Sequence, residues 1–254
     1  METSQYRRIL GIRFFIGSAG QSVERMKADG GLLVVPAAPA LKDLPTQSEY
    51  REALLDADLA ITDSALMVLV WNLLHGDKIR RVSGLEYLKR LLLEPDVRMA
   101  GNTLWIMPGE ASAKQNLRWL SSQGIRVPDS HVYLAPMYHG DIHDAKLIKL
   151  LKKLRPQHII VAVGGGTQER LGQYIKHAVN YRPAIHCIGA AIAFLSGDQV
   201  RIPAWADRMG LGWLFRCLSS PQRFVPRYWA ARKLVGLMWR YRDELPEQEE
   251  VRAA

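Results

Sequence analysis

The first 200 residues alternate short apolar runs with segments of helical periodicity, and this alternation restricts the possible fold more than any other feature. Several runs are apolar at every position, which is typical of strands buried on both faces of a parallel sheet. The pattern therefore predicts an α/β fold with a doubly wound, mainly parallel sheet and helices on both faces. The expected strands are Leu32–Val35, Leu59–Thr62, Thr103–Met107, Val132–Ala135, Ile159–Val163 and Ile185–Ile188. The expected helices include Gln47–Ala57, Ala65–Leu74, Leu85–Leu93, Ala111–Gln123, Ala145–Leu154 and Gln168–Asn180.

Neither a signal peptide nor a membrane span is expected. The N-terminal run Leu10–Gly17 is interrupted by an arginine and lacks a small-residue cleavage site, so it predicts a first strand. The uncharged apolar runs Ala65–Leu74 and Ile185–Leu195 are shorter than the roughly 18–20 residues of a spanning helix. Cys187 and Cys217 are too few for a disulfide framework or a structural zinc site, and they suit a reducing compartment. We expect a protein of the cytoplasm or of the cytoplasmic surface of a membrane.

Basic residues are concentrated towards the C-terminus. The net charge of the 254-residue chain is +9, and residues 201–242 hold nine basic residues against the single acid Asp207. Four of the seven tryptophans fall in the same stretch. Arginine forks match phosphate oxygens, and Trp favours the headgroup level of a membrane. The stretch therefore indicates a diphosphate, a lipid surface or a nucleic acid as its partner, with a solvated basic helix pair as the alternative. Because no aromatic RNA-reading motif occurs, nucleic acid is not expected.

The change in composition also suggests a boundary. Pro203, Pro221 and Pro226 are expected to break the basic stretch into short helices. We therefore divide the chain into an α/β core, residues 1–200, and a helical, Arg- and Trp-rich appendage with an acidic tail, residues 201–254. The core contains no internal repeat.

The carboxyl ends of the strands are where a doubly wound sheet binds ligands. Asp63 follows the strand Leu59–Thr62, where a carboxylate can serve as a general base. The alternative is an N-cap of the next helix, and the two roles can coexist.

A glycine-rich turn follows another strand. Gly164, Gly165 and Gly166 open a helix, so their amides and the helix N-terminus suit a phosphate or a ribose. The turn matches neither the dinucleotide fingerprint nor the Walker A motif, and a simple tight turn is the alternative. Gln168 and Glu169 fall in the first helical turn and are expected to face the same crevice.

No metal or other cofactor is expected. The segment His139–His143 and Asp144 have the residue types of a metal site, but their spacing matches no standard zinc pattern. Asp56 and Asp58 form a DxD sequence that precedes a strand instead of following one, so a solvated helix end is the better interpretation.

Five parts of the sequence together resemble the WecG/TagA/CpsF family, glycosyltransferase family 26, over roughly residues 8–230. These parts are Asp63 after its strand, the segment Arg81–Gly84, the glycine turn ending in Gln168 and Glu169, the run IGAAIAFLSG and the run WADRMGLGWLFRCLSSPQRFVPRYW. The last run is the most specific of them.

The resemblance implies an inverting hexosyltransferase that moves a sugar from a UDP-sugar to a saccharide on undecaprenyl diphosphate, forming a β-linkage without a metal. It implies a role in bacterial exopolysaccharide or cell-surface polysaccharide biosynthesis, with an anionic membrane surface as partner and a peripheral location on the inner face of the plasma membrane. By position, Asp63 matches the proposed base, and Arg81 a pocket arginine. The donor would be held by Arg81, Gly164, Gly165, Gly166, Gln168 and Glu169, and the acceptor diphosphate by Arg216, Arg223 and Arg227.

The sequence departs from the family pattern at several positions. Pro36 and Ala38 stand where the pattern has Thr and Asn, and Gly166 and Thr167 replace Pro and Lys. Ser64 replaces Gly, and Glu86 stands where Asp is common. These departures leave open a non-catalytic accessory protein that binds lipid-linked saccharide or a partner transferase. The identity of the donor sugar and the oligomeric state, a homo-oligomer included, are also open.

Overall fold

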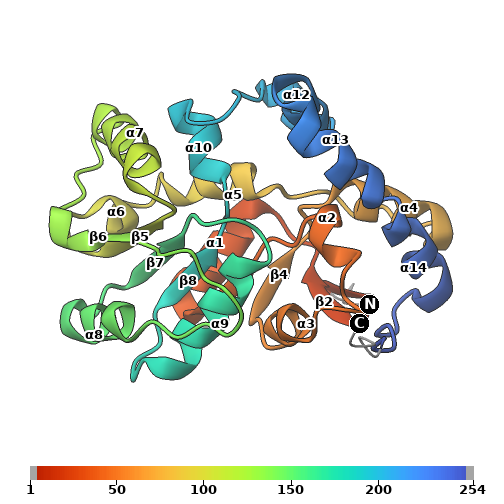
Figure 1. Ribbon diagram of the computed structural model, residues 1–254, viewed down its shortest axis with the longest axis horizontal. Coiled ribbons are helices and arrows are strands. Elements are labelled where there is room, and N and C mark those ends of the chain that lie inside the picture. Colours follow the sequence, from red (N-terminus) through yellow and green to blue (C-terminus); the bar gives the residue numbers. More distant parts are fainter. Residues whose placement is uncertain (1–4, 250–254) are drawn as a thin grey trace.

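A single twisted sheet forms the centre of the computed structural model, which describes residues 5–249 (Figure 1). Its eight strands have the order β1-β2-β4-β3-β8-β7-β5-β6. The strands are β1 (Tyr6–Ile9), β2 (Ile12–Phe15), β3 (Gly31–Val34), β4 (Leu59–Ile61), β5 (Thr103–Met107), β6 (Val132–Leu134), β7 (His158–Val161) and β8 (Ala184–Cys187). Only β1 and β2 pair antiparallel to each other, and the remaining pairs are parallel.

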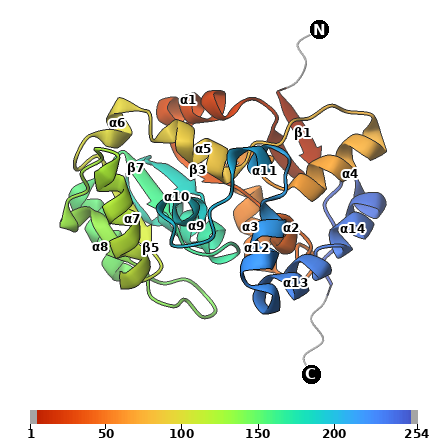
Figure 2. The ribbon, with the colours of Figure 1, turned by 90° about the horizontal axis from the view of Figure 1, so that it is seen from above.

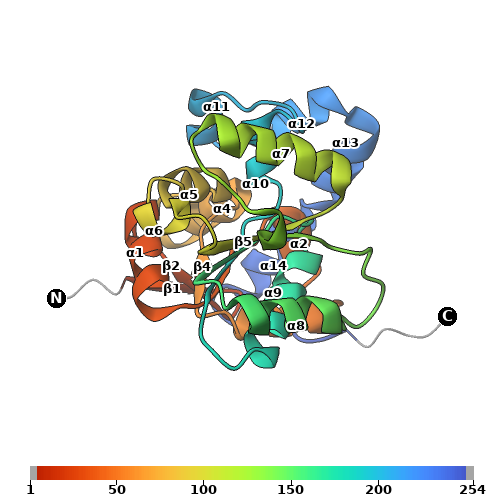
Figure 3. The same ribbon diagram turned by 90° about the vertical axis from the view of Figure 1, so that its left-hand side faces the viewer.

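Helices cover both faces of the sheet. The core helices are α1 (Ala19–Asp29), α2 (Ala38–Leu41), α3 (Ser48–Leu55), α4 (Ala65–His75), α5 (Gly84–Leu91), α6 (Pro95–Arg98), α7 (Glu110–Ser122), α8 (Ala145–Leu154), α9 (Thr167–Ala178) and α10 (Ala191–Ser196). Figure 3 shows α1 and α5 on one side of the strands and α8 and α9 on the other. Each face has its own apolar cluster, and neighbouring residues such as Leu32 and Leu33 of β3 belong to different clusters. The doubly wound α/β fold expected from the sequence is confirmed.

The N-terminal strand is a correction to the sequence interpretation. The run Leu10–Gly17 contains one strand as predicted, β2, but it is not the first: β1 precedes it, and the two form a hairpin with a turn at Leu10 and Gly11. Both turn residues have positive φ, 50° and 76°, as a two-residue hairpin with right-handed twist requires. The turn stays apolar because it is covered: Leu10 is buried, and its N–H donates to the carbonyl of Arg242 at 2.8 Å.

The C-terminal helices are α11 (Ala204–Arg208), α12 (Gly212–Ser219), α13 (Pro221–Ala230) and α14 (Lys233–Tyr241). In the view from above, α10, α11 and α12 lie near the middle of the picture (Figure 2), and Figure 1 shows α10 and α12 at the top of the molecule. The predicted break at Pro226 is wrong, because this proline lies inside α13. Its ring is on the exposed side of a ten-residue helix, so it costs one backbone hydrogen bond without ending the helix. Pro203 and Pro221 do stand at helix starts.

The last helix packs into the core. Leu234 and Met238 of α14 are buried in the cluster that also contains Trp71 of α4. The domain boundary at residue 200 stays a prediction. The packing shows that α14 contacts the apolar core of the α/β domain. Within residues 5–249, no helix combines the length and apolar character needed to cross a bilayer.

Candidate functional site

A cavity of about 920 Å³ opens at the carboxyl edge of the sheet. One side is formed by the segments that follow β3, β4 and β8, and the other by α11, α12 and α13. Asp63 and Arg81 both line it. The sequence predicts chemistry at these strand ends, and the cavity brings the ends of three neighbouring strands together.

Asp63 does not cap α4, the helix that follows it. Ser64 is the N-cap of α4, and its hydroxyl accepts from the Met67 amide at 3.2 Å. The Asp63 carboxylate instead accepts from the amide of Gly84, the first residue of α5, at 2.9 Å. Asp63 therefore sits at the N-terminus of a neighbouring helix, whose dipole stabilises its charge. The alternative N-cap interpretation of Asp63 does not hold for α4.

Arg81 lies beside Asp63. Its Nε donates to the carbonyl oxygen of Asp63 at 2.6 Å, and its Nη2 is 3.7 Å from the Asp63 Oδ1. Thr62 shapes this approach, because its buried hydroxyl donates to the carbonyl of Arg80 at 2.8 Å and accepts from the Val82 amide. The loop that carries Arg81 is thus fixed against the end of β4.

Burial raises the pKa of the Asp63 carboxyl group above its usual range. The charges of Arg81 and Arg216 and the Gly84 amide oppose this rise, while the charge of Asp207 adds to it. The side chain is 22% exposed, so a ligand in the cavity can reach it. A carboxylate with a raised pKa in a cavity has the character of a general base.

Asp207 completes the group, and the sequence analysis did not assign it a role. Its carboxylate accepts from Arg81 Nη1 at 3.1 Å and from the Ser83 hydroxyl at 2.8 Å. Ser83 is also the N-cap of α5, accepting from the Glu86 amide at 3.0 Å. One signal was available: Asp207 is the single acid among nine basic residues in residues 201–242.

The glycine turn connects β7 to α9, and Gly166 has a φ of 91°. A Cβ atom built on Gly164, Gly165 or Gly166 would meet no heavy atom within 4 Å, so a ligand can approach this backbone closely. Gln168 and Glu169, expected to face the crevice, are instead buried beneath the turn at 2% and 1% exposure.

Glu169 holds the turn from below. Its carboxylate accepts from the Gly166 amide at 2.7 Å and from the Gln168 side-chain amide at 2.9 Å. Burial raises the pKa of Glu169 to about 7. The Gln168 Oε1 atom has no hydrogen-bond partner among the described residues, and it lies against Gly189 at the end of β8.

The three arginines assigned to the acceptor occupy different places. Arg216 of α12 lines the cavity that contains Asp63, lies 4.5 Å above the Phe194 ring and donates to the Tyr228 hydroxyl at 3.2 Å. Arg223 lines a second cavity. Arg227 lines neither cavity, but its charge lowers the pKa of Glu169.

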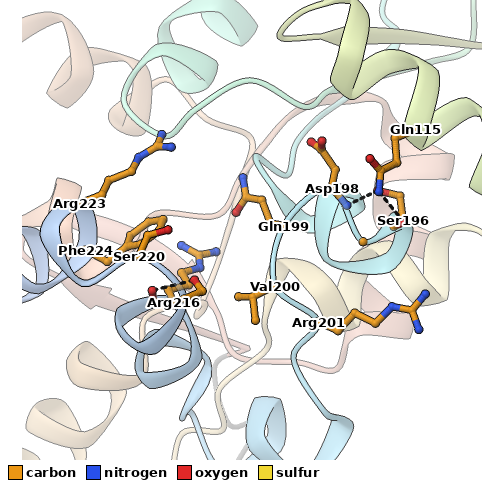
Figure 4. Close-up of a pocket in the computed structure, with 12 residues that line it drawn as sticks. Gln115, Ser196, Asp198, Gln199, Val200, Arg201, Arg216, Ser220, Arg223 and Phe224 are labelled. Carbon is orange, nitrogen blue, oxygen red and sulfur yellow. Dashed lines mark hydrogen bonds between the residues drawn. The ribbon is translucent and has the colours of Figure 1, made fainter.

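The second cavity is polar and measures about 660 Å³. Figure 4 shows Arg216 and Arg223 on one side of it, with Gln115 and Ser196 across from them. Arg216 borders both cavities, so a cationic side chain stands between them. Arginine forks suit the paired oxygens of a diphosphate.

The residues considered for a metal have other contacts. Asp144 is the N-cap of α8 and accepts from the hydroxyls of Tyr133 and Tyr138 at 2.7 Å. Asp58 pairs with Arg182 at 2.7 Å and Lys176 at 3.0 Å. Among residues 5–249, no group of three or more His, Cys, Asp or Glu side chains could hold a metal ion.

Comparison with known proteins finds a matching family model and several related proteins. The model of the "Glycosyl transferase WecG/TagA/CpsF family" matches residues 7–248. A protein of Bacillus subtilis (strain 168) named N-acetylglucosaminyldiphosphoundecaprenol N-acetyl-beta-D-mannosaminyltransferase is 23% identical, over 74% of this chain and 72% of its own length. A protein of the same name from Staphylococcus aureus (strain MW2) is 22% identical over 85% of both chains.

Proposed function

The chain belongs to the WecG/TagA/CpsF family of glycosyltransferases, and from this we propose that it moves a hexosyl group from a UDP-sugar to a saccharide linked to polyprenyl diphosphate. The observation that supports this most is the Asp63 carboxylate at the edge of the 920 Å³ cavity, with Arg81 and Arg216 beside it. The names of the related proteins supply the acceptor class: both include a sugar linked through a diphosphate to undecaprenol.

Asp63 would act as the general base of a direct displacement. Its carboxylate accepts the proton of the acceptor hydroxyl while that oxygen forms a bond to the anomeric carbon of the donor. The bond from this carbon to the UDP oxygen breaks, and UDP leaves with the electron pair. Attack from the face opposite UDP inverts the anomeric centre, which gives the β-linkage.

Backbone amides and Arg81 would stabilise the leaving group. Negative charge develops on the UDP phosphate as its bond to the sugar breaks, and prearranged donors lower the energy of that state. A Cβ atom on Gly164 or Gly165 would meet open space before α9, so a phosphate can approach this backbone and its amides. Gln168 and Glu169 would shape this turn from beneath, since both are buried.

The acceptor diphosphate would meet the C-terminal arginines. Arg216 borders both cavities and Arg223 lines the polar one. Arg227 stays in this proposed set because its charge acts on Glu169, which holds the glycine turn.

The wall beside Asp63 bears on the donor sugar. Ala37, Ala38 and Pro39 line the cavity, so this wall is apolar, and Ala38 stands where the family pattern has Asn. The donor moiety named in both relatives, N-acetylmannosamine, is the first sugar to test. The apolar wall favours a donor with fewer polar groups at that position.

We also propose that the protein works on an anionic membrane surface at the inner face of the bacterial plasma membrane. Large apolar side chains that line neither cavity are exposed on the C-terminal helices: Trp205 at 56%, Leu218 at 73% and Trp239 at 67%. Basic residues surround them in the sequence. Each basic residue near an anionic leaflet contributes about 1 kcal/mol, which supports reversible attachment.

A donor panel tests the proposed reaction. The protein is incubated with individual UDP-sugars and a short polyprenyl-diphosphate-linked N-acetylglucosamine, with EDTA present, and the products are read by mass spectrometry. A mass increase of one sugar supports the transferase and identifies the donor. If folded protein binds the acceptor but transfers no sugar from any donor, the proposed transferase function is refuted and the accessory-protein function is supported.

A further inference from the structure

The cavity that contains Asp63 is polar at one end only. Hydrogen bonds join Asp63, Arg81, Ser83 and Asp207 into one group, so these polar side chains are clustered. The remaining walls carry mostly apolar side chains. A volume of about 920 Å³ is near the upper limit of common ligand cavities, about 300–1,000 Å³. The cavity therefore has room for more than the reacting sugars.

One apolar wall runs along α4, away from the catalytic carboxylate. Leu66 and Leu69 line the cavity, and Leu69 lies four residues beyond Ala65, about 6 Å along the helix axis. Leu69 is 57% exposed, so this end of the wall reaches solvent.

The facing apolar wall belongs to α13. Val225 and Trp229 are four residues apart, so both lie on one face of the helix, and both line the cavity. Their exposures of 48% and 68% show that, like Leu69, they line the cavity where it reaches solvent. Hydroxyl groups placed between these walls would have no partners, whereas a hydrocarbon chain would lose water-exposed apolar surface.

Arg216 lies between the two ends. Its charge acts on Asp63, and its guanidinium donates to the hydroxyl of Tyr228, which precedes Trp229 in α13. The order from the polar end is thus a carboxylate, a guanidinium and then an apolar channel. The proposed acceptor has the matching order of sugar hydroxyl, diphosphate and isoprenoid chain.

We propose that the channel between Leu69 of α4 and Val225 and Trp229 of α13 binds the first isoprene units of the acceptor. This inference rests on the proposed function, because the sugar of that acceptor must reach Asp63. It assigns the start of the lipid chain to the protein, with only the remainder in the bilayer.

The test compares two acceptors in detergent-free solution, without vesicles. Both carry N-acetylglucosamine on a diphosphate, one with a ten-carbon prenyl tail and the other with a methyl group. The KM of the prenyl acceptor is expected to be about tenfold lower. Leu69→Gln and Val225→Gln are expected to raise that KM about five- to tenfold, with the KM values of the methyl acceptor and the UDP-sugar unchanged.

Leu73→Gln is the matched control. Leu73 lies one turn beyond Leu69 on α4, is 76% exposed and does not line the cavity. Its substitution should leave both acceptors unaffected. Equal KM values for the two acceptors in the unaltered protein, or equal effects of the Leu69 and Leu73 substitutions, would overturn the proposal.

A binding measurement separates this inference from the proposed reaction. Because Trp229 lines the channel, the prenyl acceptor should change the tryptophan fluorescence in a saturable way, and Leu69→Gln should weaken this binding about fivefold. Saturable binding without transfer would refute the transferase while supporting the channel. A short-chain phospholipid that displaces the prenyl acceptor with equal affinity would assign the channel to membrane lipid and refute the proposal.

Discussion

Arg81 and Asp207 form an ion pair of 3.1 Å between the loop after α4 and the C-terminal helix α11. The same arginine donates to the carbonyl oxygen of Asp63. The C-terminal helices therefore position the proposed catalytic carboxylate as well as covering it. Exposed fractions of 20% for Arg81 and 14% for Asp207 limit the screening of this pair by solvent.

Removing the carboxylate of Asp63 should stop transfer. For Asp63→Asn we expect kcat to fall about 10²- to 10⁴-fold, the usual contribution of a general base, with the KM of the UDP-sugar changed little. Initial-rate kinetics with the best donor from the panel measure the effect. Asp29→Asn, at an exposed carboxylate in the last turn of α1, is the control for loss of a negative charge. Unchanged turnover in Asp63→Asn would exclude Asp63 as the base.

Asp207 should act on the reaction through Arg81 and Asp63. Asp207→Asn weakens charge-assisted hydrogen bonds to Arg81 and Ser83, and we expect kcat to fall about 10- to 100-fold. The charge of Asp207 also contributes to the raised pKa of Asp63, so the acid limb of the kcat profile should move to lower pH.

Two further variants distinguish positioning from simple structural damage. Asp207→Glu retains the charge and should recover part of the lost activity. Ser83→Ala removes the hydrogen bond to Asp207 and the N-cap bond from the Glu86 amide, but it leaves the Arg81 ion pair in place, so its pH profile should stay where it was. A pH profile of Asp207→Asn that coincides with the original would show that Asp207 does not tune Asp63.

Glu169 should make the stability of the fold depend on pH. Burial raises the pKa of Glu169 to about 7 from 4.5, so the folded state holds this proton where the unfolded state has released it. The stabilisation of the folded state by this bound proton is fully present below about pH 4.5 and is lost as the pH rises through about 7. The loss amounts to about 3 kcal/mol of unfolding free energy.

Denaturant unfolding at pH 5 and pH 8 measures this dependence. In Glu169→Gln, which keeps the size of the side chain but cannot titrate, the difference between the two pH values should shrink by about that amount. Glu86→Gln is the control, because Glu86 forms its ion pair with Arg80 at an exposed site. The same pH difference in Glu169→Gln and in the unaltered protein would contradict the assignment.

Membrane attachment should depend on exposed apolar residues of the C-terminal helices. The double substitution of Leu218→Gln and Trp239→Gln is expected to reduce partitioning into anionic vesicles about tenfold, because both side chains are mostly exposed. Sedimentation with vesicles of phosphatidylglycerol, compared with zwitterionic vesicles, measures the effect. Leu93→Gln, at a 64% exposed leucine after α5, should change nothing. Equal partitioning of all three proteins would exclude this surface.

The parallel strands were predictable because burial on both faces leaves a local mark. Runs such as Leu32–Val35 are apolar at every position, and their predicted ends differ from the structure by at most two residues. The hairpin was not predictable in the same way. Leu10 is apolar like its neighbours although it lies in a turn, because residues from the other end of the chain cover it.

The candidate site was also predictable only in part. The position of Asp63 after β4 could be inferred, since it needs only the strand and the rule for sheet edges. Its surroundings could not: the Gly84 amide that donates to Asp63 and the Asp207 carboxylate that pairs with Arg81 are brought there by packing between distant segments. Gln168 and Glu169 lie in the predicted helical turn, but the side on which they are buried depends on how α9 packs on the sheet.

The hydrogen bond from Leu10 to the carbonyl of Arg242 has a consequence for synthesis of the chain. The ribosome makes the β1–β2 hairpin before the helices, whereas the segment that covers its turn comes directly after α14. The same late segment follows the helices that complete the cavity around Asp63. The cavity around Asp63 is therefore complete only after the C-terminal helices have been made and have packed onto the sheet.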